Sequence, residues 1–329
     1  MPSSSRDHRF AYGLHFESEF TLPELPVLPS EQQGETPNVV VEVGPTLSRA
    51  SVEALVTPDA PIANVMTFDE TQCRVLFSEV ARVSVREGKH AFVEPVEGTT
   101  SEAWRLPLLG SMLALLLEQR GLFSLHAGAV EMPGPDGPVA CAFAAEKGQG
   151  KSTLNAALSL AGFPLLCDDV LGLDMSDKVP VALRGFGSVK LVPDAVRAVV
   201  KCSPDELPQV APEIAQVSGI DKRHFTTSLA PHPRPLRHVF LLNSHEDADR
   251  DDIELQPLPI QDALAMLLPH TFGVRWGDLY LTPKRSAIHL KACAQIVTGC
   301  HVWKLSRRRD LALLPQTIEL IAHTAQNSA

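Results

Sequence analysis

The chain has 329 residues, of which 44% are hydrophobic and 21% charged, a composition typical of a globular protein with a substantial core. Its net charge of −10 argues against a protein that wraps nucleic acid or binds membranes through basic residues, because both need excess Lys and Arg. The amino terminus has no apolar secretory signal, and the longest apolar run, 106–117, is shorter than the ~20 residues of a membrane span. We therefore expect a cytoplasmic protein with neither a nucleic-acid nor a membrane partner.

The cysteines and the densest basic cluster are both interpreted as structural features. The six cysteines lie far apart and show no CxxC pair or zinc spacing, so we expect reduced thiols. The densest basic cluster, RRRD at 307–310, is either a local basic patch or a solvated helix N-terminus, and we interpret it as the latter.

The first third of the chain is predicted to be mostly β-structure. Residues 1–30 are polar and then rich in proline, whereas 38–44 (NVVVEVG) has the β-branched run of a strand. Two alternating runs within 80–95 are joined by REGK, as in a β-hairpin. We expect a smaller β-rich N-terminal domain over 1–102, with recognition of a substrate or partner as its candidate role.

From residue 103 the pattern becomes that of an α/β domain. A leucine-rich helix is predicted over 103–121, followed by strands at 122–132 and 138–146, a glycine loop, a helix that ends at Gly162, and a strand at 163–175. Further strands are predicted at 180–193, 235–243 and 301–306, and helices at 260–272 and 311–325. The predicted fold over 103–329 is a mixed sheet flanked by helices that carries a phosphate-binding loop.

The glycine loop is the strongest candidate site. In a P-loop, successive backbone N–H groups and a helix N-terminus face the phosphates, a lysine reaches them, and the next hydroxyl binds Mg²⁺. The sequence between the predicted strand and helix supplies these parts in order. The candidate nucleotide-binding residues are Gly148, Gln149, Gly150, Lys151, Ser152 and Thr153.

Two carboxylates follow at the end of a predicted buried strand. Asp168 and Asp169 are interpreted either as an exposed strand end with a capping aspartate, or as a phosphotransferase pair in which one binds Mg²⁺ and the other accepts a proton. Their position one helix after the glycine loop favours function.

Three basic segments leave alternatives open. His126 is either a satisfied structural histidine or a site residue, and Arg184 in LRGFGSV either binds phosphate or pairs with an aspartate. The segment 215–225, with Lys222 and Arg223, is either an exposed basic turn or a loop that closes over the phosphates.

Four segments in the order LHAGAV, AEKGQGKS, LLCDDVLGL and ALRGFGSV resemble the motifs of the HPr kinase/phosphorylase family, bacterial serine kinases with a phosphoenolpyruvate-carboxykinase-like fold. The resemblance spans about 120–320, and its specific signal lies within 125–190. It implies binding of ATP and Mg²⁺, with Lys151 on the phosphates and Ser152 and Asp169 toward the metal. It also implies Asp168 as the likelier general base, with His126 and Arg184 near the transferred phosphate; the sequence leaves open which aspartate has which role.

The departures from that family concern Ala145, Lys147 and Ala182, where its motifs carry glycine, serine and glutamate. The N-terminal part does not resemble that of the bacterial regulator, so the layout is closer to HPr-kinase-related proteins encoded beside peptide-modification genes. The implied acceptor is a serine hydroxyl on a peptide or small protein, and a homo-oligomer is compatible with the resemblance. Two alternatives stay open: a nucleotide-binding module without catalysis, and a kinase of a free hydroxy-amino acid.

Overall fold

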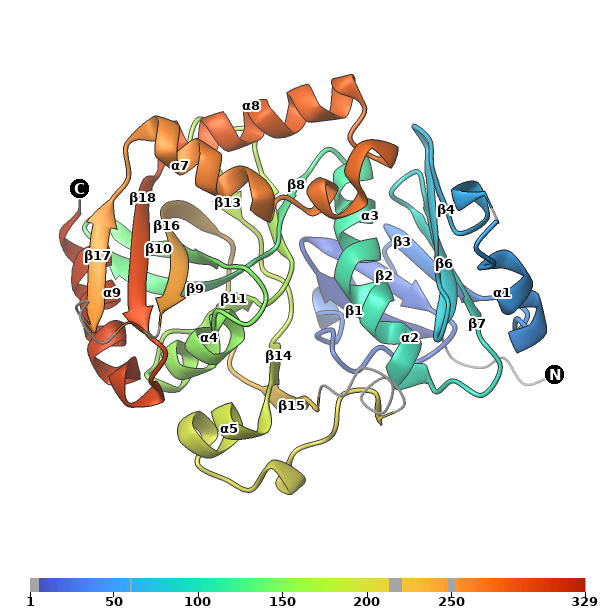
Figure 1. Ribbon diagram of the computed structural model, residues 1–329, viewed down its shortest axis with the longest axis horizontal. Coiled ribbons are helices and arrows are strands. Elements are labelled where there is room, and N and C mark those ends of the chain that lie inside the picture. The colour runs from blue at the N-terminus through green and yellow to red at the C-terminus, as the bar shows by residue number, and fades with distance from the viewer. Residues whose placement is uncertain (1–5, 60, 213–220, 246, 248–251, 329) are drawn as a thin grey trace. The chain divides into compact units, whose positions relative to one another are not determined.

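The computed structural model describes residues 6–59, 61–212, 221–245, 247 and 252–328. The chain divides into two compact units, one formed by 1–122 with 209–221 and the other by 123–208 with 222–329. Each combines helices with a mixed sheet, which confirms the predicted α/β class (Figure 1). No helix among the described residues is long and apolar enough to cross a membrane. All six cysteines are free thiols, as expected.

A seven-stranded sheet forms the centre of the first unit, in the order β1-β2-β3-β7-β6-β5-β4. The pairs β2–β3 and β3–β7 are parallel and the others are antiparallel. The predicted strand at 38–44 and the predicted hairpin at 80–95 are present as β3 and as β6 with β7. The strands are β1 (Asp7–Ala11), β2 (Leu14–Ser18), β3 (Val39–Val43), β4 (Met66–Phe68), β5 (Gln72–Phe77), β6 (Ala81–Arg86) and β7 (His90–Pro95).

The leucine-rich helical segment belongs to this first unit. It consists of α2 (Ser101–Pro107), a π-helical turn at Leu108–Met112 and α3 (Leu113–Gln119). Leucines of its apolar face line one small cavity together with sheet residues such as Val41 and Val85. The sequence pattern placed a domain boundary at 102/103, whereas the units divide at 122/123, because this helix buries its leucines against the first sheet.

A nine-stranded mixed sheet forms the centre of the second unit. Its order is β11-β9-β10-β16-β13-β12-β8, with β18 paired to β16 and β17 to β18. The two strands β14 (Ser188–Leu191) and β15 (Arg223–Thr226) form a separate pair. The nine strands are β8 (Phe123–Leu125), β9 (Ala127–Gly134), β10 (Gly137–Ala144), β11 (Leu165–Cys167), β12 (Leu171–Asp174), β13 (Val181–Ala182), β16 (Arg234–His245), β17 (Ile253–Pro257) and β18 (His301–Arg308).

Strand direction brings several chain segments to one edge of this sheet. Strands β10, β16 and β18 run parallel, while β9 is antiparallel to both β10 and β11. The carboxyl ends of β10, β11, β16 and β18 therefore meet the beginning of β9 at the same edge. In open α/β sheets, ligands bind outside the carboxyl ends of parallel strands, so this edge is where a site is expected.

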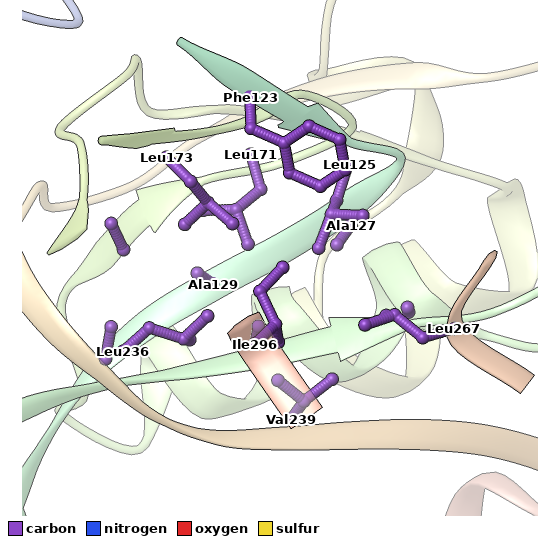
Figure 2. Close-up of a cluster of buried hydrophobic side chains, with 14 of the residues drawn as sticks. Phe123, Leu125, Ala127, Ala129, Leu171, Leu173, Leu236, Val239, Leu267 and Ile296 are labelled. Atoms are coloured by element: carbon purple, nitrogen blue, oxygen red, sulfur yellow. The ribbon is translucent and has the colours of Figure 1, made fainter. Parts of the chain in front are cut away.

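Helices cover the second sheet on two faces. Successive residues of β10 alternate between two apolar clusters, with Ala142 and Ala144 in one and Cys141 and Phe143 in the other. The first cluster includes residues of α7 and α8, and Figure 2 shows its side chains from β8, β9, β12 and β16 against Leu267 and Ile296. The second includes residues of α4 and α9. Among the described residues, the α-helices of this unit are α4 (Lys151–Leu160), α5 (Pro193–Ala195), α7 (Ile260–Leu267), α8 (Pro283–Gly299) and α9 (Leu314–Asn327).

Two strands predicted as continuous are interrupted in the structure. The strand predicted at 122–132 is broken at His126, between β8 and β9, and the strand predicted at 163–175 is broken at Asp168–Asp169, between β11 and β12. In both cases the chain passes from one strand pairing to another, since β9 and β11 pair with each other whereas β8 pairs with β12. The interruptions release the side chains of His126 and the two aspartates from the regular ladder.

Candidate functional site

The glycine loop 145–150 connects the end of β10 to the first turn of α4. Gly148 and Gly150 have φ values of 86° and 83°, in the left-handed region that favours glycine. Ala145 is buried and does not adopt a positive φ, so the missing first glycine of the motif imposes no backbone strain here. Lys147, the second departure, is exposed.

The side chain of Gln149 attaches the loop to the neighbouring strand. Its Oε1 accepts a hydrogen bond from the backbone N–H of Ser244 at 2.7 Å and another from the Ser244 hydroxyl. Ser244 lies near the carboxyl end of β16, so the loop is held directly above the sheet edge. Gln149 was predicted as a nucleotide-binding residue, and in the structure its side chain supports the loop.

Lys151, the first residue of α4, turns its side chain into the protein. The residue is 7% exposed, and its Nζ lies 3.1 Å from Nε2 of His126 and 3.9 Å from Oδ1 of Asp169. Burial lowers the pKa of Lys151, while the two neighbouring aspartates raise it. The structure thus brings together a lysine, a histidine and an aspartate that lie far apart in the sequence.

The hydrogen bonds of His126 determine which ring nitrogen carries the proton. Its Nδ1 lies 3.1 Å from the backbone oxygen of Asp169, which can only accept, so Nδ1 donates. Nε2 is then the acceptor for the Lys151 ammonium. Burial, with Lys151 second, lowers the pKa of His126 to about 4, so the ring is neutral at pH 7.

The two aspartates have different environments. Asp168 is 3% exposed; its Oδ1 accepts a hydrogen bond from Asn155 Nδ2 at 2.7 Å, and its Oδ2 has no partner among the described residues. Burial and the adjacent Asp169 raise the pKa of Asp168. Burial also acts on Asp169, but Lys190 and Lys151 lower its pKa, and Lys190 Nζ donates to its Oδ2 at 2.8 Å.

The backbone of Asp169 has a φ of 66°, a conformation that is uncommon for residues other than glycine. Strained residues of this kind concentrate at functional sites. The conformation turns the chain from β11 toward β12 so that both carboxylates stay at the sheet edge.

Three further residues near Lys151 were missed by the sequence analysis. Lys190, on β14, forms an ion pair with Asp169. Burial lowers the pKa of His270, and the nearby charge of Lys151 lowers it further. Burial likewise lowers the pKa of Lys151, and Arg275 is close enough to lower it further. The backbone oxygen of His270 also accepts from the N–H of His126 at 2.7 Å. No local motif surrounds any of the three, so only the packing of distant segments identifies them.

Arg184 and Ala182 follow the aspartates along the chain. The backbone N–H of Gly185 donates to the oxygen of Leu166, which places Arg184 beside the segment that leads to Asp168. Its Nε has no hydrogen-bond partner among the described residues. Ala182 is fully buried in an apolar cluster. It stands where the HPr kinase/phosphorylase motifs carry a glutamate, and in this chain that position belongs to the hydrophobic core.

The segment 215–225 is described only in part. Residues 215–220 lie outside the described residues, and Arg223 begins β15, where its guanidinium lies 3.5 Å from the carboxylate of Asp205.

A groove of about 310 Å³ lies beside the glycine loop. It is lined by Gly148, Gln149, Gly150, Thr153, Val192, Asp194, Ala195, Ser244, Arg307, Arg309, Asp310 and Leu311. The interpretation of 307–310 as a solvated helix N-terminus is wrong for Arg307, which is 6% exposed and lies on β18. An extension of the predicted strand 301–306 by two residues would have placed it at the sheet edge.

Metal ligands were predicted at Ser152 and Asp169. Among the described residues there is no group of three or more His, Cys, Asp or Glu side chains that could hold a metal by themselves. Mg²⁺ commonly uses one or two carboxylates together with substrate phosphates. The Ser152 hydroxyl is near enough to Asp168 to lower its pKa, so a hydroxyl and the two adjacent carboxylates lie together where such an ion would bind.

The two loop glycines offer a matched pair of substitutions. A Cβ at Gly150 would lie 2.5 Å from Nη2 of Arg307, whereas a Cβ at Gly148 would meet no atom within 4 Å. We expect Gly148→Ala to lower the free energy of unfolding by about 1–2 kcal/mol through its left-handed backbone alone. Gly150→Ala should lower it further, because Arg307 must also move. Urea denaturation of both variants measures the difference, and equal losses would contradict the contact with Arg307.

Comparison with known proteins finds likeness among solved structures. No protein-family model matches the chain, and no curated protein matches it. Among solved structures, the HPr(Ser) kinase/phosphatase from Coxiella burnetii is similar over 61% of this chain and 95% of that one, with 13% identity and a TM-score of 0.28. Likeness at this level transfers no activity, so the chemistry of the site rests on its own side chains.

Proposed function

We propose that the second unit is an Mg-ATP-dependent phosphotransferase that moves the γ-phosphate to a hydroxyl group, in the first instance a serine of a peptide or small protein. The observation that carries this proposal is the meeting of Lys151, His126 and the two aspartates at the N-terminus of α4, behind a loop with two left-handed glycines. Each group has a separate task in such a transfer.

The glycine loop and α4 are suited to the phosphates. Backbone N–H groups at a helix N-terminus attract anions, and Lys151 adds a positive charge at the same place. Lys190 and Arg275 increase the local positive charge in a chain whose net charge is −10. Phosphoryl transfer depends mainly on positioning and on such charge stabilisation.

Asp168 is the better placed of the two aspartates to accept a proton. Its Oδ2 is unpartnered among the described residues, and its raised pKa suits a general base. In the proposed step the acceptor hydroxyl loses its proton to Asp168, its oxygen bonds to the γ-phosphorus, and the bond from that phosphorus to ADP breaks. Asp169, held by Lys190, keeps the negative charge beside Lys151 and fixes His126 through its backbone oxygen.

Mg²⁺ is the expected cofactor, with Ser152 and Asp169 as its candidate ligands. When bound, it neutralises phosphate charge and orients the phosphate chain. Arg184, beside the same segment, has an unpartnered Nε and is a candidate for contact with the transferred phosphate.

A nucleotide-binding module without catalysis is the second candidate. It is favoured by the burial of Ala182 in the apolar core and by the pairing of Asp169 with two lysines, which leaves fewer free carboxylate oxygens for metal than a catalytic pair offers. In this case the nucleotide would regulate binding of a peptide or protein partner.

The test uses the purified full-length protein with γ-labelled ATP and Mg²⁺. Serine-containing peptides, free serine and water are offered as separate acceptors. We expect label on a peptide hydroxyl and none after addition of EDTA. Label on free serine alone would indicate a small-molecule kinase. Nucleotide binding without transfer to any acceptor would favour the nucleotide-binding module without catalysis. Failure to bind nucleotide would exclude both the kinase and the module.

A further inference from the structure

Arg307 is a buried cation at the edge of the glycine loop. It lies on β18, opposite Ser244 of β16 in register, and Ser244 in turn holds Gln149. Its Nη2 is so near Gly150 that a side chain at that position would displace it. The guanidinium therefore reaches the loop one residue before the start of α4.

This cation lacks a compensating anion in the described part of the protein. Arg307 is 6% exposed, its Nε has no hydrogen-bond partner there, and no carboxylate of a described residue forms an ion pair with it. Burial of an unpaired charge is costly, and burial alone accounts for the lowered pKa of this guanidinium. Its neighbour Arg308 is more exposed and pairs with Asp252 at 2.8 Å. Within the described part of the chain, Arg308 is thus paired with a carboxylate and Arg307 is not, so Arg307 is the one available to bind an anion.

Strand order places Arg307 and the aspartates on opposite flanks of the loop. The loop follows β10. Asp168 follows β11, two strands away on one side, whereas Arg307 is the penultimate residue of β18, two strands away on the other. The Arg307 side chain reaches back from its strand to Gly150, so its guanidinium lies beside the loop. The groove lies on the Arg307 flank, and none of His126, Lys151 and the aspartates lines it.

The groove has both apolar and polar side chains in its lining. Val192 and Leu311, which are 43% and 37% exposed, contribute apolar side chains, while Thr153 and Asp194 contribute polar groups. Ligand sites combine apolar walls with a few polar groups in this way. A nucleotide with its γ-phosphate at the aspartates would extend across the loop toward this groove.

We propose that Arg307 binds the α- and β-phosphates of the nucleotide and that the groove beside it receives the nucleoside. The inference rests on the proposed function and adds the direction in which the nucleotide lies. It makes Arg307 a contact for the two phosphates that ADP and ATP share.

The test compares Mg-ADP and Mg-ATP binding by calorimetry in the wild type, Arg307→Met and the matched control Arg308→Met. Arg307→Met should weaken both nucleotides by the same factor, about tenfold to a hundredfold, as expected for loss of charge-assisted hydrogen bonds. Arg308→Met should leave both affinities unchanged.

Each other outcome has a definite meaning. Unchanged affinities in a folded Arg307→Met protein, or a loss confined to ATP, would overturn the inference while leaving the proposed function intact. Failure of the wild type to bind either nucleotide would overturn both. Melting curves establish folding, and if Arg307→Met is unfolded, Arg307→Gln is measured against the same expectations.

Discussion

Asp168→Asn is expected to retain nucleotide binding and to lose phosphoryl transfer by about 10²–10⁴-fold, the range of general-base contributions. The amide has the same shape and its oxygen can still accept from Asn155 Nδ2, so the local structure should persist. It cannot accept the proton of the acceptor hydroxyl. Initial rates of label transfer and calorimetric nucleotide affinities separate the two effects.

Asp174→Asn is the matched control, since Asp174 ends β12 six residues further along the chain and its carboxylate accepts from the backbone of Ser176. It should transfer phosphate at the wild-type rate. Equal rates in Asp168→Asn and the wild type would exclude Asp168 as the base.

Although Asp168→Asn should abolish most of the transfer activity, it is expected to stabilise the folded protein. Because burial and Asp169 raise the pKa of Asp168, the folded state holds this proton at pH values where the unfolded chain has lost it. This carboxyl group therefore destabilises the protein increasingly as the pH rises above the ordinary value of 3.8. Asp168→Asn should raise the free energy of unfolding at pH 7, and the gain should shrink toward pH 4. Urea denaturation at both pH values measures it, and a loss of stability at pH 7 would contradict the described environment.

Lys151→Met is expected to weaken Mg-ATP binding about 100-fold or more and to reduce transfer below detection. The methionine fills much of the same buried space but cannot donate to phosphate, and each charge-assisted hydrogen bond contributes about 1.5–3 kcal/mol. Asp169 keeps its 2.8 Å bond to Lys190, so the fold should survive. Calorimetry and label transfer report the two losses.

Lys147→Met is the control for charge in the same loop. Lys147 is exposed, so its removal should change affinity little. A second readout is the pKa of His126. Burial lowers this pKa most, and the positive charge of Lys151 lowers it further, to about 4. Lys151→Met should raise it, as measured by NMR titration, and Lys147→Met should not. Equal effects of both lysines on affinity would indicate nonspecific attraction of the nucleotide.

Local sequence was sufficient to predict the glycine loop and most of the strands and helices around it. Gly148, Gly150 and Lys151 lie within four residues, and a tight turn followed by a helix depends on interactions between neighbours along the chain. Asp168 and Asp169 were also recognisable from local sequence, because two adjacent carboxylates directly after an apolar strand are unusual. The mixed α/β class followed from the alternation of such elements.

The partners of these residues were decided by tertiary structure. Lys190 reaches Asp169, the backbone of His270 reaches His126, and Arg307 reaches Gly150. These contacts depend on how β14, the segment after α7 and the end of β18 pack, and no periodicity in the sequence encodes them. The boundary at 122/123 depends likewise on the sheet against which a leucine-rich helix packs, because its pattern specifies an apolar face but not the surface that covers it. Short-range backbone preferences thus determine where the loop forms, whereas burial and charge pairing between distant segments determine which cations and carboxylates surround it.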